Sequence, residues 1–340
     1  MEVTLLVKMG LGGYFSNPID NPVNIIKYAY SSGIKFFDTS PAYGDSERWF
    51  GEALESAKRN TFILSTKTKA KTASELDTDF ATSLVRLKTG YIDIYFGHDF
   101  INDMETWEAS QEALNAMFFL KEHKYIDKVG VSGHSIRAAV SAIDRGVDYI
   151  MVPHSIMLRA FENVMTYAQN KGVKVITMKN FGSGILLGGP GENEFKKKVT
   201  LQDIVNFSLY TEGVDTIIPA ARSIQQVNDL VMAYHRSKPL SSKEVWLLER
   251  TIVDFLGEDF CRFCNLCRPC DVHGWSMSQP GILKTMIYEN AFHLDMEETY
   301  KGYKKNSLDC EGCDNLCSKR CPFGIDIKEA MKKVHNYFGG

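Results

Sequence analysis

Eight short apolar segments alternate with amphipathic segments of helical periodicity over roughly the first 240 residues of this 340-residue chain. The apolar segments, bounded by Gly, Asp, Ser or Pro, are 3–7, 34–37, 62–64, 92–96, 128–131, 149–152, 173–177 and 216–218. The amphipathic segments include 23–31, 47–57, 76–87, 111–122, 136–145, 161–169 and 201–211. Eight strand–helix units predict the α/β class, and this count favours a closed (β/α)8 TIM barrel over an open doubly wound sheet.

Glycines lie at boundaries between the predicted helices and strands. Gly33, Gly172 and Gly213 each precede a predicted strand, where glycine supplies the left-handed conformation that ends a helix. The dinucleotide fingerprint G-x-G-x-x-G followed by a helix is missing, although residues 10–13 form a glycine-rich turn. We interpret residues 10–13 as a barrel loop that allows close approach of the backbone.

Composition narrows the classes of partner and location. Hydrophobic residues make up 44% and charged residues 24% of the chain, and the net charge is −3. This balance is ordinary for a globular protein and gives no electrostatic reason to bind nucleic acid or an anionic membrane. No apolar run approaches the ~20 residues needed to cross a bilayer. Because the N-terminus lacks the basic start, apolar centre and cleavage site of a secretory signal, we expect a cytoplasmic protein.

Four polar residues follow the ends of successive predicted strands, where barrel active sites lie. Asp38 follows the second strand, Tyr43 lies on the loop after it, Lys67 ends the third and His98 ends the fourth. A Tyr hydroxyl can protonate a carbonyl oxygen, a Lys cation lowers its pKa, an Asp fixes the Lys, and a His orients the substrate. Each residue alone is more often structural, but together they predict a carbonyl–alcohol site.

The blocks 38–44 (DTSPAYG), 46–54 (SERWFGEAL), 65–67 (STK) and 97–98 (GH) resemble those of the aldo/keto reductase family. The resemblance covers about the first 235 residues. It implies a (β/α)8 barrel that binds NADP(H) or NAD(H) and interconverts a small carbonyl and an alcohol. It further implies that Tyr43 is the proton donor, that Lys67 and Asp38 tune it, and that His98 orients the substrate.

The same resemblance implies a cofactor site along the strand ends. The implied cofactor-binding residues are Gly12, Asp38, Ser132, Met178, Lys179, Arg222, Ser223 and Gln226. Three positions depart from the usual pattern: Gly133 replaces an Asn, Met151 replaces a Gln, and Met178 replaces the aromatic that stacks on the nicotinamide. Arg222 is expected to meet a phosphate or to be a solvated loop cation. Nicotinamide binding is therefore expected, with its affinity and the choice between NAD and NADP left open.

The C-terminal part of the chain carries a second signal. All eight cysteines lie between positions 261 and 321, in the two runs Cys261-x2-Cys264-x2-Cys267-x2-Cys270 and Cys310-x2-Cys313-x3-Cys317-x3-Cys321-Pro322. Four thiolates within ten residues are spaced too closely for a usual zinc finger and suit a compact iron–sulfur cluster. We therefore predict two domains, a barrel over 1–256 and a small α-helical, ferredoxin-like iron–sulfur domain over 257–340.

The second run ends in Cys-Pro and resembles a bacterial ferredoxin run, in which the fourth Cys binds the partner cluster. This implies two [4Fe–4S] clusters with exchanged fourth ligands: Cys261, Cys264, Cys267 and Cys321 on one, and Cys310, Cys313, Cys317 and Cys270 on the other. The spacing departs from C-x2-C-x2-C-x3-C-P in both runs. A structural zinc site and a single cluster with spare cysteines remain alternatives. The tail as a whole resembles an aldo/keto reductase subgroup with a C-terminal ferredoxin-like domain.

Three functions are compatible with these signals. The first is a hydride-transferring carbonyl–alcohol oxidoreductase whose clusters are structural, serve an external ferredoxin or other electron carrier, or deliver electrons to the substrate. The second is a cluster-fed reductase with weak or no nicotinamide binding, suggested by residues 133, 151 and 178. The third is a non-catalytic electron-transfer or redox-sensing protein, which the complete set of four polar residues argues against.

Overall fold

The computed structural model describes residues 8–15, 17–189, 193–257, 260–264, 266–268, 270, 272–274, 277–303, 310 and 313–338. The first predicted strand, 3–7, lies outside them. By contacts the chain forms two compact units. The first unit is Met1–Ser155, Arg159–Asn180 and Ile204–Leu240; the second is Ile156–Leu158, Phe181–Asp203 and Ser241–Gly340. The domain boundary at 256/257 stays a prediction, since this division falls at a different place.

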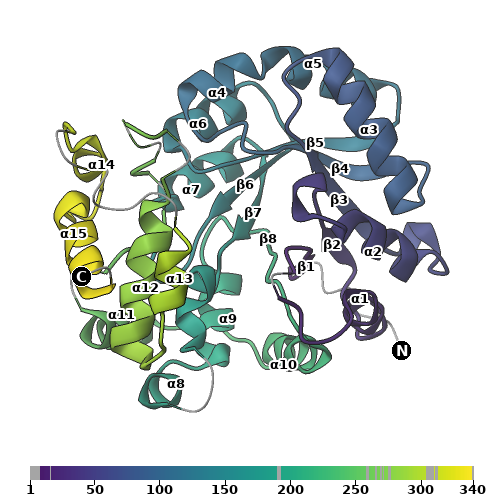
Figure 1. Cartoon of the computed structure of the whole chain (residues 1–340). Coiled ribbons are helices and arrows are strands. Elements are labelled where there is room, and N and C mark those ends of the chain that lie inside the picture. Colours follow the sequence, from purple (N-terminus) through teal and green to yellow (C-terminus); the bar gives the residue numbers. More distant parts are fainter. Residues whose placement is uncertain are drawn as a thin grey trace. The chain divides into compact units, whose positions relative to one another are not determined.

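The first unit is a parallel barrel (Figure 1). Its strands are β1 (Leu11–Gly12), β2 (Phe36–Asp38), β3 (Ile63–Thr68), β4 (Ile92–Gly97), β5 (Ile126–Ser132), β6 (Tyr149–Pro153), β7 (Lys174–Met178) and β8 (Thr216–Ile217). Within the described ranges the eight strands pair in parallel and in chain order. Parallel bridges from Met9 to Ile217 and from Gly12 to Ala220 join β1 to the β8 side. The predicted (β/α)8 barrel is thus confirmed.

Among the described residues, the first strand is β1, which begins at Leu11. Leu11 and Gly12 form β1 and pair with β2, so the interpretation of residues 10–13 as a loop was wrong for these two. The expected close approach does occur at Gly13, where a Cβ atom would lie 2.8 Å from the Asp38 carbonyl oxygen and 2.6 Å from Ser46 Oγ. Glycine-rich sequence therefore reflects packing against neighbouring backbone as well as turn geometry.

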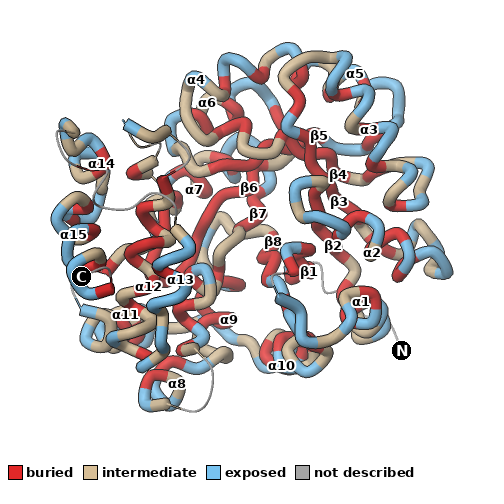
Figure 2. Tube along the Cα trace, in the orientation of Figure 1, coloured by how far each residue is buried: buried red, intermediate tan, exposed pale blue. Residues whose placement is uncertain are grey.

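Helices surround the strands of the first unit. They are α1 (Pro22–Ser31), α2 (Ser46–Leu54), α3 (Ala73–Leu87), α4 (Met104–Ala109), α5 (Gln111–Glu122), α6 (Ile136–Asp144), α7 (Glu162–Asn170) and α10 (Ile224–His235), with α9 (Leu201–Tyr210) crossing into it, and the 3₁₀ turns η1 (Pro41–Tyr43) and η2 (Arg59–Thr61). Gly33, Gly172 and Gly213 have φ values of 99°, 73° and 81°, as the predicted helix ends require. Figure 2 shows the strands buried and the outer helix faces exposed.

The barrel has two apolar layers. One fills the space between strands and helices, with members such as Tyr95, Phe100 and Phe161. The other fills the interior, where Phe36, Ile94, Phe96, Met151, Ile176 and Ile218 pack together and Met178 lies against them. Met151 is therefore a buried interior residue. These layers fix the strand ends on which the polar residues stand.

The second unit is helical. Its elements are η3 (Gly182–Leu187), α8 (Glu194–Lys198), α11 (Ser242–Leu256), α12 (Gln279–Phe292), α13 (Glu297–Lys301), α14 (Leu316–Lys319) and α15 (Ile327–Phe338). Its core combines apolar residues of α12 and α15 with seven of the eight cysteines: Cys267, Cys310 and Cys317 are buried in it, and Cys261, Cys270, Cys313 and Cys321 pack against it. In the part of the chain that the structure describes, none of the helices has the length and apolar character needed to cross a membrane.

Candidate active site

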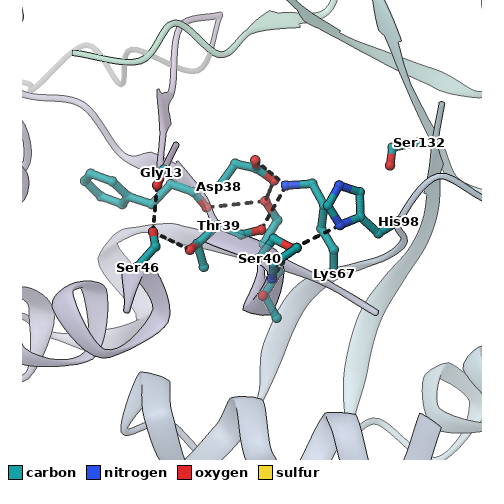
Figure 3. Close-up of polar contacts among 12 residues, drawn as sticks. Gly13, Asp38, Thr39, Ser40, Ser46, Lys67, His98 and Ser132 are labelled. Atoms are coloured by element: carbon teal, nitrogen blue, oxygen red, sulfur yellow. Dashed lines mark hydrogen bonds and ion pairs between the residues drawn. The ribbon is translucent and has the colours of Figure 1, made fainter. Parts of the chain in front are cut away.

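A buried ion pair joins the ends of β2 and β3. Lys67 Nζ lies 2.5 Å from Asp38 Oδ2 and 2.8 Å from the Thr39 carbonyl oxygen, and both charged side chains are almost fully buried. The other carboxylate oxygen, Asp38 Oδ1, accepts a hydrogen bond from Ser65 Oγ at 2.8 Å. Figure 3 shows the Lys67 side chain reaching the Asp38 carboxylate. The pair is therefore compensated on both sides, as buried charges require.

Lys67 also contacts Tyr43, which lies on η1. Its Nζ atom is 4.9 Å from the Tyr43 ring centre, and its positive charge acts to lower the pKa of the Tyr43 hydroxyl. Because an ammonium group can only donate hydrogen bonds, Lys67 does not compete for the phenol proton. Asp38 and Thr39 accept two of the protons of Lys67, and the Tyr43 ring lies beside the cation.

His98, just past β4, completes this group. Its ring lies edge-on to Tyr43, with the ring centres 5.7 Å apart. His98 Nδ1 is 3.0 Å from Ser40 Oγ, and the same Oγ accepts the Ala42 backbone N–H at 3.1 Å (Figure 3). Ser40 is also the residue before η1, and its carbonyl oxygen accepts the Tyr43 N–H at 3.0 Å. The structure therefore brings Asp38, Tyr43, Lys67 and His98 together, as the sequence predicted.

Burial and charge set the protonation of this group. Burial lowers the pKa of His98 to about 3, and the Lys67 cation adds to the effect, so the imidazole is neutral near pH 7. Burial opposes the charge of Lys67, but Asp38 and Tyr43 outweigh it and raise its pKa. Burial also raises the pKa of Tyr43, against the lowering effect of Lys67. The resting site thus holds a phenol, an ammonium and a neutral imidazole.

The predicted cofactor residue Ser132 is bonded within the protein. Its hydroxyl accepts the Asp99 backbone N–H at 3.2 Å and lies 3.4 Å from the Gly97 carbonyl oxygen. The next residue, Gly133, packs so closely that a Cβ atom would lie 2.6 Å from the Ile101 carbonyl oxygen. The chain at Ile101 thus occupies the space that a side chain at position 133 would need.

The other predicted residues of the strand ends differ in their surroundings. Gly12 belongs to β1, and its N–H donates to the Pro219 carbonyl oxygen at 2.8 Å. Met178 ends β7, half-buried against the barrel interior. Lys179, the next residue, has a left-handed backbone with φ of 60°. Gly12 and Met178 lie at barrel strands, as a cofactor across the strand ends would require.

Arg222, Ser223 and Gln226 stand at the start of α10. Ser223 Oγ accepts the Gln226 N–H at 3.2 Å, and Gln226 Oε1 accepts the Arg222 N–H at 2.7 Å. The exposed Arg222 side chain donates through Nε to the Asn17 carbonyl oxygen at 2.8 Å. Asp20 accepts the Ile224 N–H at 2.8 Å. A carboxylate therefore occupies part of the N-terminus of α10, beside the residues that the family resemblance assigns to the cofactor.

Seven of the eight cysteines of the two runs belong to one packed cluster in the second unit. Cys264, Cys267, Cys310 and Cys317 are buried, and the other four are half-buried. The eight cysteines, all of them described, form no disulfide bonds. Within the described ranges, no three Cys, His, Asp or Glu side chains converge closely enough to hold a single metal ion.

Neighbour relations among the thiols cross between the runs. Burial raises the pKa of Cys261 to about 12, and the nearby thiols of Cys264 and Cys321 raise it further. Burial likewise raises the pKa of Cys310 to about 11, with Cys313, Cys317 and Cys270 adding to it. Cys321 of the second run thus lies beside the first run, and Cys270 of the first lies beside the second.

Sequence reasoning missed three residues of the site. Ser40 was quoted within its block without a role, although Ser before Pro is a usual sign of a capped turn. Ser65 and Asp20 gave no usable signal. The bond of Ser65 to Asp38 depends on strand register, and that of Asp20 to α10 joins residues 204 positions apart.

Comparison with known proteins supports the same family assignment for the barrel. The sequence profile of the aldo/keto reductase family matches residues 8–207. L-galactose dehydrogenase of Arabidopsis thaliana is 26% identical over 68% of this chain and 83% of its own length. D-arabinose 1-dehydrogenase of Saccharomyces cerevisiae is 36% identical over 36% of this chain, and the alignment spans only 40% of that enzyme.

Solved structures agree on the fold. The holo form of an aldo-keto reductase from Bacillus halodurans superposes with a TM-score of 0.62, at 22% identity, over 72% of this chain and 91% of its own. A Bombyx mori aldo-keto reductase in complex with NADP gives a TM-score of 0.58 at 17% identity, over 72% of this chain and 88% of its own. Since the family profile matches more than half of the sequence, the chain belongs to the aldo/keto reductase family and is an NAD(P)H-dependent oxidoreductase.

Proposed function

We propose that the barrel reduces a small carbonyl compound to an alcohol, and the reverse, at the group formed by Tyr43, Lys67, Asp38 and His98. The observation that carries this proposal is the hydrogen bonding of Lys67. Two of its donors are held by Asp38 and Thr39, and the cation lies 4.9 Å from the Tyr43 ring centre. The phenol proton is thereby left for a substrate oxygen.

Each of these four residues then has a separate role in the reaction. Bound NAD(P)H supplies the hydride that the carbonyl carbon accepts. Tyr43 gives its proton to the carbonyl oxygen, and the adjacent Lys67 cation stabilises the phenolate that remains. Asp38 holds Lys67 in place. Neutral His98 donates a hydrogen bond to the same oxygen and orients the carbonyl.

We propose that the nicotinamide cofactor is held by Gly12, Asp38, Ser132, Met178, Lys179, Arg222, Ser223 and Gln226. The donor set partly fits. Met178 supplies an adaptable apolar surface for a ring, and Arg222 has a guanidinium that suits phosphate. Ser132 and Gln226 already have partners in the protein, and Asp20 adds a negative charge beside Arg222. These contacts support cofactor binding that is weaker than the complete pattern would give.

The names of the matching relatives suggest a substrate class. Two of them are sugar dehydrogenases, acting by name on L-galactose and D-arabinose. We therefore propose that aldoses and small hydroxyaldehydes belong to the substrate range.

We further propose that the second unit binds two [4Fe–4S] clusters, which makes the chain a member of the subgroup with a ferredoxin-like tail. Seven cysteines in one packed cluster, with neighbours crossing between the runs, support this proposal. Thiolates are the ligands that such clusters take. Because these clusters need a reducing compartment, we propose that the protein works in the cytoplasm.

The first experiment tests the barrel chemistry. Anaerobically purified protein is mixed with NADH or NADPH and a panel of aldoses and small aldehydes, and nicotinamide oxidation is followed by absorbance. We expect turnover in wild type and a loss of kcat of about 10²–10⁴-fold in Tyr43→Phe, with cofactor binding unchanged. No turnover and no fluorescence change with either nicotinamide would instead favour the cluster-fed reductase.

The second experiment tests the clusters and their ligand sets. Iron and acid-labile sulfide are counted in wild type, in Cys264→Ser/Cys321→Ser and in Cys264→Ser/Cys270→Ser. Crossed pairing predicts that the first variant keeps one cluster and that the second loses both. Uncrossed runs predict the opposite, and zinc without sulfide would point to a structural zinc site. If neither the Tyr43 substitution nor the cysteine substitutions change any turnover, the non-catalytic alternative is favoured.

A further inference from the structure

The five residues from Cys317 to Cys321 span both predicted clusters. In the proposed ligand sets Cys317 belongs to one cluster and Cys321 to the other. A short segment of one helical turn, α14, therefore connects the two groups of thiols. Any molecule seated on this segment is within a few bonds of a ligand of either cluster.

The side chains on this segment are exposed and of two kinds. Leu316 and Phe323 are apolar and have exposed fractions of 40% and 38%. Lys319 and Arg320 are cationic and exposed. Leu316, Lys319 and Arg320 are three and four positions apart on α14 and so share a face. We call Leu316, Lys319, Arg320 and Phe323 the α14 patch.

Cations predominate around the α14 patch. The sequence from 315 to 325 reads NLCSKRCPFGI and contains no Asp or Glu. A third cation, Arg262, lies next to Cys261, with its guanidinium 5.5 Å from the Phe323 ring centre. Two carboxylates flank this sequence: Asp314, which is exposed, and Asp326, whose Oδ1 accepts from Ser318 Oγ and from the Glu329 N–H, each at 3.1 Å.

We propose that the α14 patch is the docking surface for an acidic one-electron carrier protein. This rests on the proposed function, because it requires the clusters. Exposed cations steer an acidic partner, and the apolar pair Leu316 and Phe323 forms a small contact centre of the kind used in brief electron-transfer encounters. The step is the reversible transfer of one electron: the reduced carrier is oxidised, one cluster goes from the 2+ to the 1+ state, and no bond or proton changes.

The test uses the full chain with its clusters. The probe is an acidic flavodoxin in its hydroquinone form, freed of excess reductant, because its oxidation to the semiquinone has its own absorbance. Stopped-flow absorbance gives the second-order rate of electron transfer at low and high salt. Methyl viologen radical is the parallel donor, since a small cation needs no protein docking surface.

We expect Lys319→Glu/Arg320→Glu to slow transfer from flavodoxin by on the order of tenfold or more at low salt and to flatten its salt dependence. Leu316→Ser/Phe323→Ser should slow it at all salt concentrations. Lys332→Glu/Lys333→Glu, a matched charge reversal on exposed positions of α15, should leave the rate unchanged. Reduction by methyl viologen should not fall in any variant.

Equal slowing by the α15 variant, or no slowing by the α14 variant, would overturn the docking site. A change in oligomeric state on sedimentation of the α14 variant would show that a second copy of the chain covers the patch and would also overturn it. If the wild-type protein contains no iron or sulfide, and methyl viologen radical does not bleach the absorbance of the protein, the cluster proposal itself fails. The viologen control therefore separates failure of docking from failure of the proposed function. Lys319→Gln/Arg320→Gln, which only neutralises charge, replaces the reversal if the latter does not fold.

Discussion

Ser40 Oγ lies 3.0 Å from His98 Nδ1, and the Ser40 carbonyl oxygen accepts the N–H of Tyr43 at 3.0 Å. One residue thus holds both groups that are to meet the substrate oxygen. If Ser40 donates to Nδ1, the neutral imidazole carries its proton on Nε2, where it can donate to a carbonyl. Ser40 therefore acts as a positioning residue for His98.

We expect Ser40→Ala to lower kcat by roughly tenfold while cofactor affinity is unchanged, because the His98 ring and its tautomer are no longer fixed. Imidazole ¹⁵N shifts should show an Nε2-protonated His98 in wild type and a mixture in the variant. Ser40→Thr keeps the hydroxyl and should restore activity. Ser241→Ala, which removes the cap of α11 in the second unit, is the control for simple loss of a cap. An unaltered ¹⁵N pattern in Ser40→Ala would contradict this role.

The Asp38–Lys67 pair gives a prediction about stability. Replacing either partner alone (Asp38→Asn or Lys67→Met) leaves an uncompensated buried charge and should cost about 3–5 kcal/mol in the free energy of unfolding. The double variant should cost clearly less than the sum of the two. Urea unfolding of the four proteins measures the coupling, and additive costs would show that the two side chains act independently.

The lowered pKa of His98 predicts a dependence of stability on pH. Its pKa is about 3 when folded, against an ordinary value of 6.5, so between these values the unfolded state binds the extra proton. Lowering the pH from 7 to 5 should then cost the native state about 2 kcal/mol through this group. His98→Gln should lose that part of the pH dependence. Equal slopes for both proteins in urea unfolding at pH 7 and pH 5 would refute a buried neutral His98.

The carboxylate of Asp20 at the start of α10 gives a prediction about cofactor choice. A 2′-phosphate near Arg222 would be repelled by Asp20. Asp20→Asn, which keeps an acceptor for the Ile224 N–H, should tighten NADPH binding by several-fold and leave NADH binding nearly unchanged. Fluorescence titration with both cofactors measures the ratio. Asp229→Asn, an exposed substitution on the same helix, is the matched control.

The barrel could be predicted because the pattern of an apolar strand followed by an amphipathic helix recurs along the chain. An error in the position of one strand therefore does not change the predicted fold. The error at Leu11 and Gly12 shows the weak point: a two-residue strand flanked by glycine has no periodicity to recognise. The set Asp38, Tyr43, Lys67 and His98 could be predicted because each residue follows a strand end. Contacts such as Ser40 with His98 depend on side-chain direction in loops, which periodicity does not specify.

The cofactor residues illustrate the same limit. Ser132 and Gln226 match a pattern by position, yet both are bonded within the protein. A sequence pattern names the residue at a place but not the partners that already hold its polar atoms. The cysteine runs are a different case. Their spacing predicts a cluster site with crossed ligands, and in the structure the Cys321 thiol raises the pKa of Cys261, 60 positions away in the chain.

The close packing of Gly133 has a consequence for protein engineering. Because the Ile101 carbonyl oxygen would lie 2.6 Å from any Cβ atom at this position, no substitution can be introduced there alone. A designer who wishes to place an amide side chain at residue 133 must first re-route the segment 99–102, which is anchored to β5 through the Ile101 N–H to Ser132 carbonyl bond of 3.2 Å. The two changes must therefore be made together.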